Sequence, residues 1–421
     1  MNEIKKTILF VLVASVLAVS AVFVDPGART PDVFSDQGEA FYPNFTDPLA
    51  PKAIEVIDYD EATATARPLK VEFAENKWRI PSHYNYPSDA EDRLAKTAAA
   101  LMELRKDIVI SDRVEDQTEF GVIDPLDPAA VSLAGRGKRV TLRDANGDVL
   151  ADFIVGKKVT DKPGYVYLRV PSQRRTYAVK TDADVSARFA DWIETDLLKL
   201  TPGDIRKVAI NSYSINEQFG RLENVEQFTL TKSNDKWMIS GGGNPVDAKM
   251  QALTSALDNL RIVNVQPKPA NLTEDLKTQS GIQLSMESVM SLRQKGFFMT
   301  QTGQLFSNEG EIIVDAANGL QYTLRFGEIA STGGSESDEA AGAKEGETQA
   351  KESGKDEQRY LFITVGYSEA RARQYADGKD PDKKGEELAR ELRNRFADWY
   401  YVITGADFNN LRPHRRDLLK G

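Results

Sequence analysis

Two stretches of the chain share one pattern of apolar and polar positions. Residues 71–80 and residues 228–239 each hold two short runs in which apolar and polar side chains alternate around a polar turn. Such paired runs predict β-hairpins. Trp78 and Trp237 occupy the same place in the two stretches. Similarity of this kind between distant segments predicts an internal repeat.

A helical pattern follows each hairpin. In the first copy, Ser88 and Glu91 have the spacing of a capping box, which marks the start of a helix. In both copies, apolar residues then recur every three or four positions, which places them on one helical face. These residues are Leu94, Ala98, Leu101 and Leu104 in the first copy, and Met250, Leu253, Leu257 and Leu260 in the second. Faces with this spacing indicate helices packed on a core rather than cofactor sites.

The similarity continues beyond the helices. Asn-Gly occurs at 146–147 and again at 318–319, each time between alternating runs. This dipeptide is the strongest short hairpin signal, because both central residues of a type I′ turn need positive φ. The segment around Gly121 is aligned with Ser280-Gly281-Ile282. The strands expected to complete the copies are 165–170 and 176–179 in the first, and 360–365 and 400–403 in the second.

The chain is therefore predicted to have an α+β fold with two tandem modules, each an antiparallel sheet with a packed helix. The predicted segments are a transmembrane anchor or signal segment at 1–24, a stalk or lead-in at 25–66, a first module at 67–204 and a second module at 205–421. The second module carries two insertions. Residues 331–358 are acidic, with almost no apolar side chains, and are expected to be disordered. Residues 368–397 are dense in charge and are predicted to form a solvated helix.

The N-terminus predicts the compartment. Lys5 and Lys6 precede an apolar run at 8–24, which Asp25 ends. The run lies at the lower edge of the length that spans a bilayer. An uncleaved signal anchor is favoured, and a cleaved signal peptide is the alternative. In both cases the lysines stay in the cytoplasm. The expected location is the inner (cytoplasmic) membrane, with a single pass and with most of the chain in the periplasm.

Composition excludes several classes of function. The chain has no cysteine, which excludes disulfides, thiolate metal sites and a lipoprotein anchor. His83 and His414 are its two histidines, which disfavours clustered histidine ligands. The formal charge is −10 and the pI about 5.1. An acidic protein of this kind is not expected to bind nucleic acid, which requires a basic surface.

The candidate chemical motifs are weak. Residues 144–148 resemble a calcium loop, but the glycine and the bidentate glutamate of an EF-hand are not at the required positions. The three glycines at 241–243 lie between a strand and a helix but lack the Lys-Ser/Thr ending of a P-loop. His83 has no glycine-flanked serine nearby. We therefore expect no enzyme: no catalytic, cofactor-binding or metal-binding residues are predicted, and no small-molecule ligand is identifiable.

The arrangement resembles the family called domain of unknown function 4340. The resemblance covers most of residues 67–415 and includes the N-terminal membrane segment. The motifs that carry it are KWRIP at 77–81, FGV at 120–122, Gly156 at a hairpin end, YAV at 177–179, RYLF at 359–362 and FADWYYVI at 396–403. The resemblance implies a gene neighbourhood of ABC-type permeases and gliding-motility-type auxiliary components, and it assigns no catalytic residue.

Two classes of function remain at this point. The first is a membrane-anchored, extracytoplasmic auxiliary or scaffold protein of an ABC-2-type transport system, which acts through protein–protein contacts. Its expected partners are the membrane, through the N-terminal helix, and a permease or auxiliary subunit. The second is an envelope protein that binds or hydrolyses glycans or peptides, which would require a pocket with converging polar groups. The repeat and the N-terminal anchor favour the first class.

Overall fold

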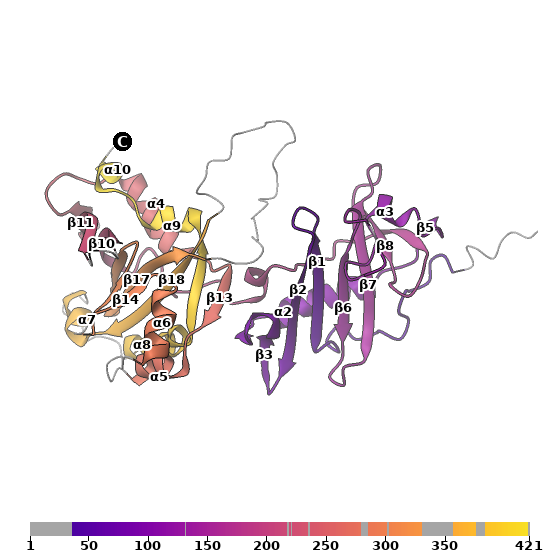
Figure 1. The fold of residues 1–421 in the computed structure, drawn as a ribbon, viewed down its shortest axis with the longest axis horizontal. Helices are drawn as coiled ribbons and strands as arrows, with labels where there is room; N and C mark the ends of the chain where they lie inside the picture. Colours follow the sequence, from indigo (N-terminus) through magenta and orange to yellow (C-terminus); the bar gives the residue numbers. More distant parts are fainter. Residues whose placement is uncertain are drawn as a thin grey trace, which may run out of the picture.

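A computed structural model describes residues 36–130, 132–216, 219, 221–234, 236–278, 285–300, 303–330, 357–375 and 384–419. The predicted anchor at 1–24 and most of the acidic insertion at 331–358 lie outside these residues. None of the described helices combines the length and the apolar character needed to cross a bilayer. The fold is a mixture of antiparallel sheets and helices, and Figure 1 shows two bodies, each built around one large sheet.

The first sheet has nine strands in the order β4-β3-β2-β1-β6-β7-β8-β9-β5, and all of its pairings are antiparallel. Its strands are β1 (Ala53–Asp60), β2 (Thr65–Ala74), β3 (Lys77–Ile80), β4 (Tyr86–Pro87), β5 (Ile108–Ser111), β6 (Lys138–Arg143), β7 (Val149–Lys158), β8 (Tyr165–Arg169) and β9 (Thr176–Lys180). The helices of this half are η2 (Pro81–His83), α2 (Glu91–Met102), α3 (Gln117–Phe120) and η3 (Phe189–Trp192).

The second sheet has eight strands in the order β12-β11-β10-β16-β17-β18-β19-β13, and β14 and β15 form a separate pair. The strands of this half are β10 (Ile205–Asn216), β11 (Arg221–Ser233), β12 (Lys236–Ile239), β13 (Asn264–Pro267), β14 (Phe297–Met299), β15 (Leu305–Ser307), β16 (Glu311–Ala316), β17 (Leu320–Ile329), β18 (Gln358–Tyr367) and β19 (Trp399–Thr404). The helices are α4 (Asp247–Asp258), α5 (Ala270–Thr278), α6 (Met286–Arg293), α7 (Glu369–Tyr375), α8 (Lys384–Ala397), α9 (Gly405–Leu411) and α10 (Arg415–Leu419).

The two large sheets have corresponding strand orders. When β4 is left out, the eight remaining strands of the first sheet correspond one to one, in sheet order, to the eight strands of the second. The correspondence begins with β3 and β12 and ends with β5 and β13. Trp78 is the second residue of β3 and Trp237 is the second residue of β12. Gly147 and Gly319 both lie in the turn after the equivalent strand, with φ of +89° and +87°. The positions that predicted the repeat therefore coincide in topology.

Each large sheet is covered by the helix that the sequence predicted. Leu94, Ala98 and Leu101 of α2 are buried in the core, as are Met250 and Leu257 of α4. The start of α2 differs from the prediction, because its N-cap is Ala90 and no side chain caps it. The Ser88 hydroxyl instead donates to the carbonyl oxygen of Trp192, at 2.5 Å. Ser88 thus joins the start of the helix to a distant segment.

The predicted lead-in at 25–66 requires correction. Strand β1 lies at the centre of the first sheet, where it pairs with β2 on one side and with β6 on the other. Its Ile54 and Val56 are fully buried. Phe41, further upstream, packs edge-on against Phe153 and Tyr177. Residues 36–66 therefore belong to the first module. Acidic and polar residues between the apolar positions of β1 concealed the strand in the sequence.

The predicted counterpart of Gly121 also requires correction. Gly121 follows α3 with φ of +70°, and Gly296 follows α6 with φ of +78°. The residue that precedes each of these glycines has its carbonyl oxygen close to a second glycine, which is Gly156 in the first module and Gly327 in the second. A Cβ built on Gly156 would lie 2.4 Å from the Phe120 carbonyl oxygen, and one built on Gly327 would lie 2.1 Å from the Lys295 carbonyl oxygen. Gly296 therefore occupies the place assigned to Gly281, which lies outside the described residues.

The charged insertion at 368–397 forms α7 and α8, but α8 is not a solvated helix. Its Ala389, Leu392 and Phe396 are buried in the main core. Arg395, near its C-terminal end, donates to the carbonyl oxygens of Asp196 and Leu197 at 3.2 and 3.4 Å. The outer face of α8 carries the charge, and the inner face packs on β18. The helix also connects the second module to the segment that leaves the first.

The acidic insertion joins two neighbouring strands of the second sheet. Ile329 of β17 lies opposite Arg359 of β18, and the Ala330 N–H donates to the Gln358 carbonyl oxygen at 2.8 Å. We expect that replacing residues 331–356 by a short Asn-Gly turn does not lower the free energy of unfolding and raises it by at most about 2 kcal/mol, because each halving of a loop's length saves only about 0.6 kcal/mol of closure entropy. Thermal denaturation followed by circular dichroism measures this. A large loss of stability would mean that the segment packs on the fold.

Candidate functional site

The residues that the sequence analysis considered for chemistry have structural roles. His83 stacks on Phe189, with ring centroids 4.5 Å apart, and burial lowers its pKa to about 4. His414 pairs with Glu226 at 2.9 Å. The Asp144 carboxylate accepts the N–H groups of Asn146 and Asp148, so this loop is the predicted hairpin turn. Within the described residues, no group of three or more His, Asp or Glu side chains is placed to hold a metal ion.

The glycines at 241–243 form a turn between β12 and α4. All three have positive φ, between +80° and +91°. The guanidinium group of Arg415 donates to the Gly242 carbonyl oxygen. This backbone oxygen of the turn is thus bound by a side chain of the protein itself. This agrees with the interpretation of the segment as a turn.

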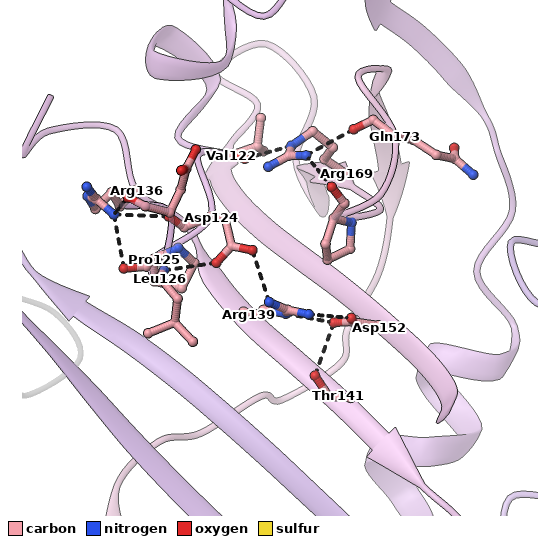
Figure 2. Close-up of polar contacts among 12 residues, drawn as sticks. Val122, Asp124, Pro125, Leu126, Arg136, Arg139, Thr141, Asp152, Arg169 and Gln173 are labelled. Atoms are coloured by element: carbon pink, nitrogen blue, oxygen red, sulfur yellow. Dashed lines mark hydrogen bonds and ion pairs between the residues drawn. The ribbon is translucent and has the colours of Figure 1, made fainter. Parts of the chain in front are cut away.

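A polar cluster on the first sheet was not predicted. Figure 2 shows Arg139 between two carboxylates: it binds Asp152 through Nε and Nη2 at 3.0 and 2.7 Å, and Asp124 through Nη1 at 3.0 Å. Thr141 also donates to Asp152, at 3.0 Å. Charge-assisted, two-point contacts of this kind are strong and fix orientation. The cluster fixes the loop that contains Asp124 to strands β6 and β7.

Two further arginines hold the same loop region. Arg169, which is buried, donates to the carbonyl oxygens of Val122, Pro171 and Gln173, and burial lowers its pKa (Figure 2). Arg136 donates to the carbonyl oxygens of several loop residues and lies over the ring of Tyr59. Because these guanidinium groups bind backbone oxygens of the chain itself, we interpret the cluster as structural.

A polar hollow of about 320 Å³ lies beside this region of the first module. Its charged side chains form ion pairs: Lys138 lies 3.2 Å from Asp58, and Arg188 lies 2.9 Å from Asp191. Arg67 and Asp184 pair with neighbouring residues outside the lining. A ligand that used these groups would have to compete with existing ion pairs. The hollow therefore has no clear preference for a ligand of either charge.

The second module contains a groove of about 320 Å³ with apolar walls. Ile215 of β10 and Leu222 of β11 are cross-strand neighbours and form one wall. Phe298 of β14 and Phe306 of β15 are also cross-strand neighbours and form the other. The groove thus lies between two hairpins whose apolar pairs both line it. Directly paired side chains on one face of a ribbon support each other, which gives the walls a defined shape.

The groove is built from elements that are extended or added relative to the first module. Strands β10 and β11 have 12 and 13 residues, whereas their counterparts β1 and β2 have 8 and 10. Strands β14 and β15 and the helix α6 stand where the first module has only the short helix α3 before its next strand. Ordered elements that are added to one copy of a repeat and that form a hollow are candidates for function.

Exposed apolar side chains lie on the elements that form the groove. Met286 and Met290 are four residues apart on α6, the helix that contributes Arg293 to the groove, and both are exposed. Phe219 and Val225, on the hairpin of β10 and β11, are exposed as well. Methionine is flexible and polarizable, and it is common on surfaces that accept varied apolar partners. Large exposed apolar patches mark interaction sites.

Comparisons with known proteins support the family resemblance over part of the chain. Residues 78–278 match the model of the family described as Domain of unknown function (DUF4340). No curated protein and no solved structure matches the chain. The matched segment runs from β3 to the end of α5. It includes the wall of the groove formed by β10 and β11, and it ends before α6, β14 and β15, which complete the groove.

Proposed function

We propose that this protein is a membrane-anchored, extracytoplasmic auxiliary or scaffold subunit of an ABC-2-type, gliding-motility-like transport system. It acts by binding other proteins rather than by catalysis. The observation that carries the protein-binding part is the apolar groove between the hairpins of β10–β11 and β14–β15. The association with a transporter rests on the family resemblance, and the compartment rests on the lysines and apolar run of the N-terminus.

The character of the groove supports protein binding over chemistry. Its walls are formed by Ile215, Leu222, Phe298 and Phe306, and exposed methionines lie on the adjoining helix. Protein interfaces are enriched in aromatic residues, methionine and arginine at their cores. A catalytic centre instead needs polar groups that converge on a reacting atom. The residues that line the groove do not provide such a set.

The proposal predicts that Leu222→Asp weakens binding to the permease. Leu222 is 41% exposed, so the substitution costs the fold little, but it places a charge in an apolar contact. We expect about tenfold less permease to co-purify, which corresponds to about 1.4 kcal/mol of binding free energy. The tagged full-length chain is recovered from solubilised membranes of its native host, and the ABC-type permeases that co-purify with it are identified and quantified by mass spectrometry.

The matched control is Val149→Asp. Val149 lies on a hairpin of the first module and is 48% exposed, which is similar to Leu222. The same change of side chain at this position should leave co-purification unchanged. If the wild-type chain recovers no permease, the proposed function is wrong. If Val149→Asp loses as much permease as Leu222→Asp, the loss is not specific to the groove, and the assignment of the contact to the groove is contradicted.

A further inference from the structure

The groove combines apolar walls with positive charge at its edge. Among the described residues that line it, Arg221 and Arg293 are the charged ones, and none of these lining residues carries a carboxylate group. The chain as a whole has a formal charge of −10, so this concentration of positive charge differs from its general character. Complementary charge across an interface favours one class of partner and repels the other. The groove is therefore suited to an occupant that carries a negative charge.

Arg221 can bind a ligand while it keeps its present contacts within the chain. Its guanidinium group lies over the ring of Phe219, 5.3 Å from the centroid, and binds Glu223 at 3.1 Å. Its side chain nevertheless remains 67% exposed. A guanidinium group has five N–H donors in a planar fork and can bind a second carboxylate while it keeps the first. The contacts with Phe219 and Glu223 hold the fork at the edge of the groove.

The size of the groove limits what enters it. Its volume of about 320 Å³ lies at the lower end of the range of roughly 300–1,000 Å³ that is usual for small-molecule and cofactor sites. One or two large side chains fill a space of this size. A membrane surface, in contrast, would take up protruding side chains and would make no use of a hollow between two walls.

We propose that the groove receives a peptide segment of a protein partner in which one or two bulky apolar side chains lie next to a carboxylate. The apolar side chains enter between the pair Ile215–Leu222 and the pair Phe298–Phe306. The carboxylate binds at the edge, where Arg221 and Arg293 lie. This inference rests on the proposed function and states the chemistry of the partner segment that the groove selects.

The test is a selection of peptides against the full-length chain in lipid nanodiscs. A random peptide library displayed on phage is the probe. We expect the enriched peptides to combine bulky apolar residues with a neighbouring Asp or Glu. Binding of an enriched peptide should fall about tenfold for Arg221→Glu, because the substitution replaces an attraction by a repulsion. Exchanging the acidic residue of that peptide for lysine should restore binding to the Arg221→Glu variant.

Two further variants separate charge from shape. Leu222→Asp should abolish binding of the enriched peptides, whereas Arg416→Glu, at an arginine whose side chain is 73% exposed on α10, should have no effect. Enrichment of peptides without acidic residues, or binding that Arg221→Glu leaves unchanged, would overturn the inference. Arginine-dependent binding of anionic lipid vesicles, with no peptide enriched, would assign the surface to membranes instead and would also overturn it.

The outcomes distinguish this inference from the proposed function. A chain that selects acidic-apolar peptides but recovers no permease from membranes supports the chemistry of the groove and contradicts the transporter association. A chain that recovers the permease equally well with and without Leu222→Asp supports the association and contradicts the role of the groove.

Discussion

Replacing Trp192 by alanine is expected to destabilise the folded chain by about 3–5 kcal/mol, the usual cost of removing a buried aromatic ring. Trp192 is completely buried. Its Nε1–H donates to the Ser186 carbonyl oxygen at 3.0 Å, and the guanidinium group of Arg93 lies over its ring at 5.3 Å. The truncation removes the ring from the core and leaves the Ser186 carbonyl without this donor.

The loss of stability from Trp192→Ala is expected to involve more than the cavity left by the ring, because Trp192 also contacts the segment before α2. Its backbone carbonyl oxygen accepts the Ser88 hydroxyl and the Asp89 N–H, so the residue fixes the segment just before α2. It lies in η3, close to the passage from the first module to the second. We expect that unfolding in urea, followed by circular dichroism, shows a lower midpoint for Trp192→Ala.

Trp78→Ala and Trp237→Ala are the matched controls. Both residues are only partly buried, and each is the second residue of a four-residue strand, β3 or β12. Each should therefore cost less than Trp192→Ala, and the two values should be similar because the positions are equivalent in the two sheets. A cost for Trp78→Ala that equals that of Trp192→Ala would contradict the role assigned to Trp192.

The strand order could be predicted where both the signal and its partner are local. The turns at Gly147 and Gly319 join strands that are adjacent in sequence, so Asn-Gly alone identifies the pairing. Strand β1 was missed because one of its two neighbours, β6, is far along the chain, and because Glu55 and Asp58 interrupt its apolar positions. A central strand defined by long-range pairing leaves only a weak local pattern.

The burial of α8 shows a different reason for an incorrect prediction. Its charged residues dominate the composition, which favours the interpretation as a solvated helix. Ala389, Leu392 and Phe396 nevertheless recur every three or four residues and form its buried face. Periodicity therefore predicts the packing of this helix better than average polarity does.

The groove could not be predicted from any single motif. Ile215, Leu222, Phe298 and Phe306 come from two hairpins that have β12, α4, β13, α5 and α6 between them in the sequence, and none of these residues is unusual by type. The two copies differ at the groove, because β10 and β11 are longer than their counterparts β1 and β2 in the first module. Comparing the two copies therefore locates the groove where no single motif does.

Replacing Lys268 by methionine is expected to change the dependence of stability on pH. Lys268 is buried beneath the second sheet, and burial strongly lowers its pKa. Its Nζ donates to the Phe396 carbonyl oxygen at 2.7 Å and lies 4.1 Å from the ring centroid of Phe362. The charge of Asp398 opposes the lowering but is the weaker influence. No feature of the sequence around Pro267 and Pro269 indicated this buried amine.

The direction of the effect follows from proton linkage. Between the lowered pKa of Lys268 in the folded chain and the ordinary value of 10.5, the unfolded chain binds more protons than the folded chain. Stability of the wild type therefore rises with pH in this window, by at most about 1.4 kcal/mol for each pH unit. The Lys268→Met variant lacks this contribution. The difference in free energy of unfolding, variant minus wild type, should be largest at the acidic end of the window and should decrease as pH rises toward 10.5.

The measurement is urea unfolding of both chains at a series of pH values up to the alkaline limit of the folded state. Lys295, whose pKa burial also lowers, is present in both chains and cancels in the difference. Lys249→Met is the control, because Lys249 lies exposed on α4 and its charge remains in water; this curve should run parallel to that of the wild type. If the difference in free energy of unfolding between Lys268→Met and the wild type stays constant with pH, Lys268 keeps its proton in the core. The contacts with the Phe396 carbonyl and the rings of Phe362 and Tyr400 would then suffice to hold a charged amine there.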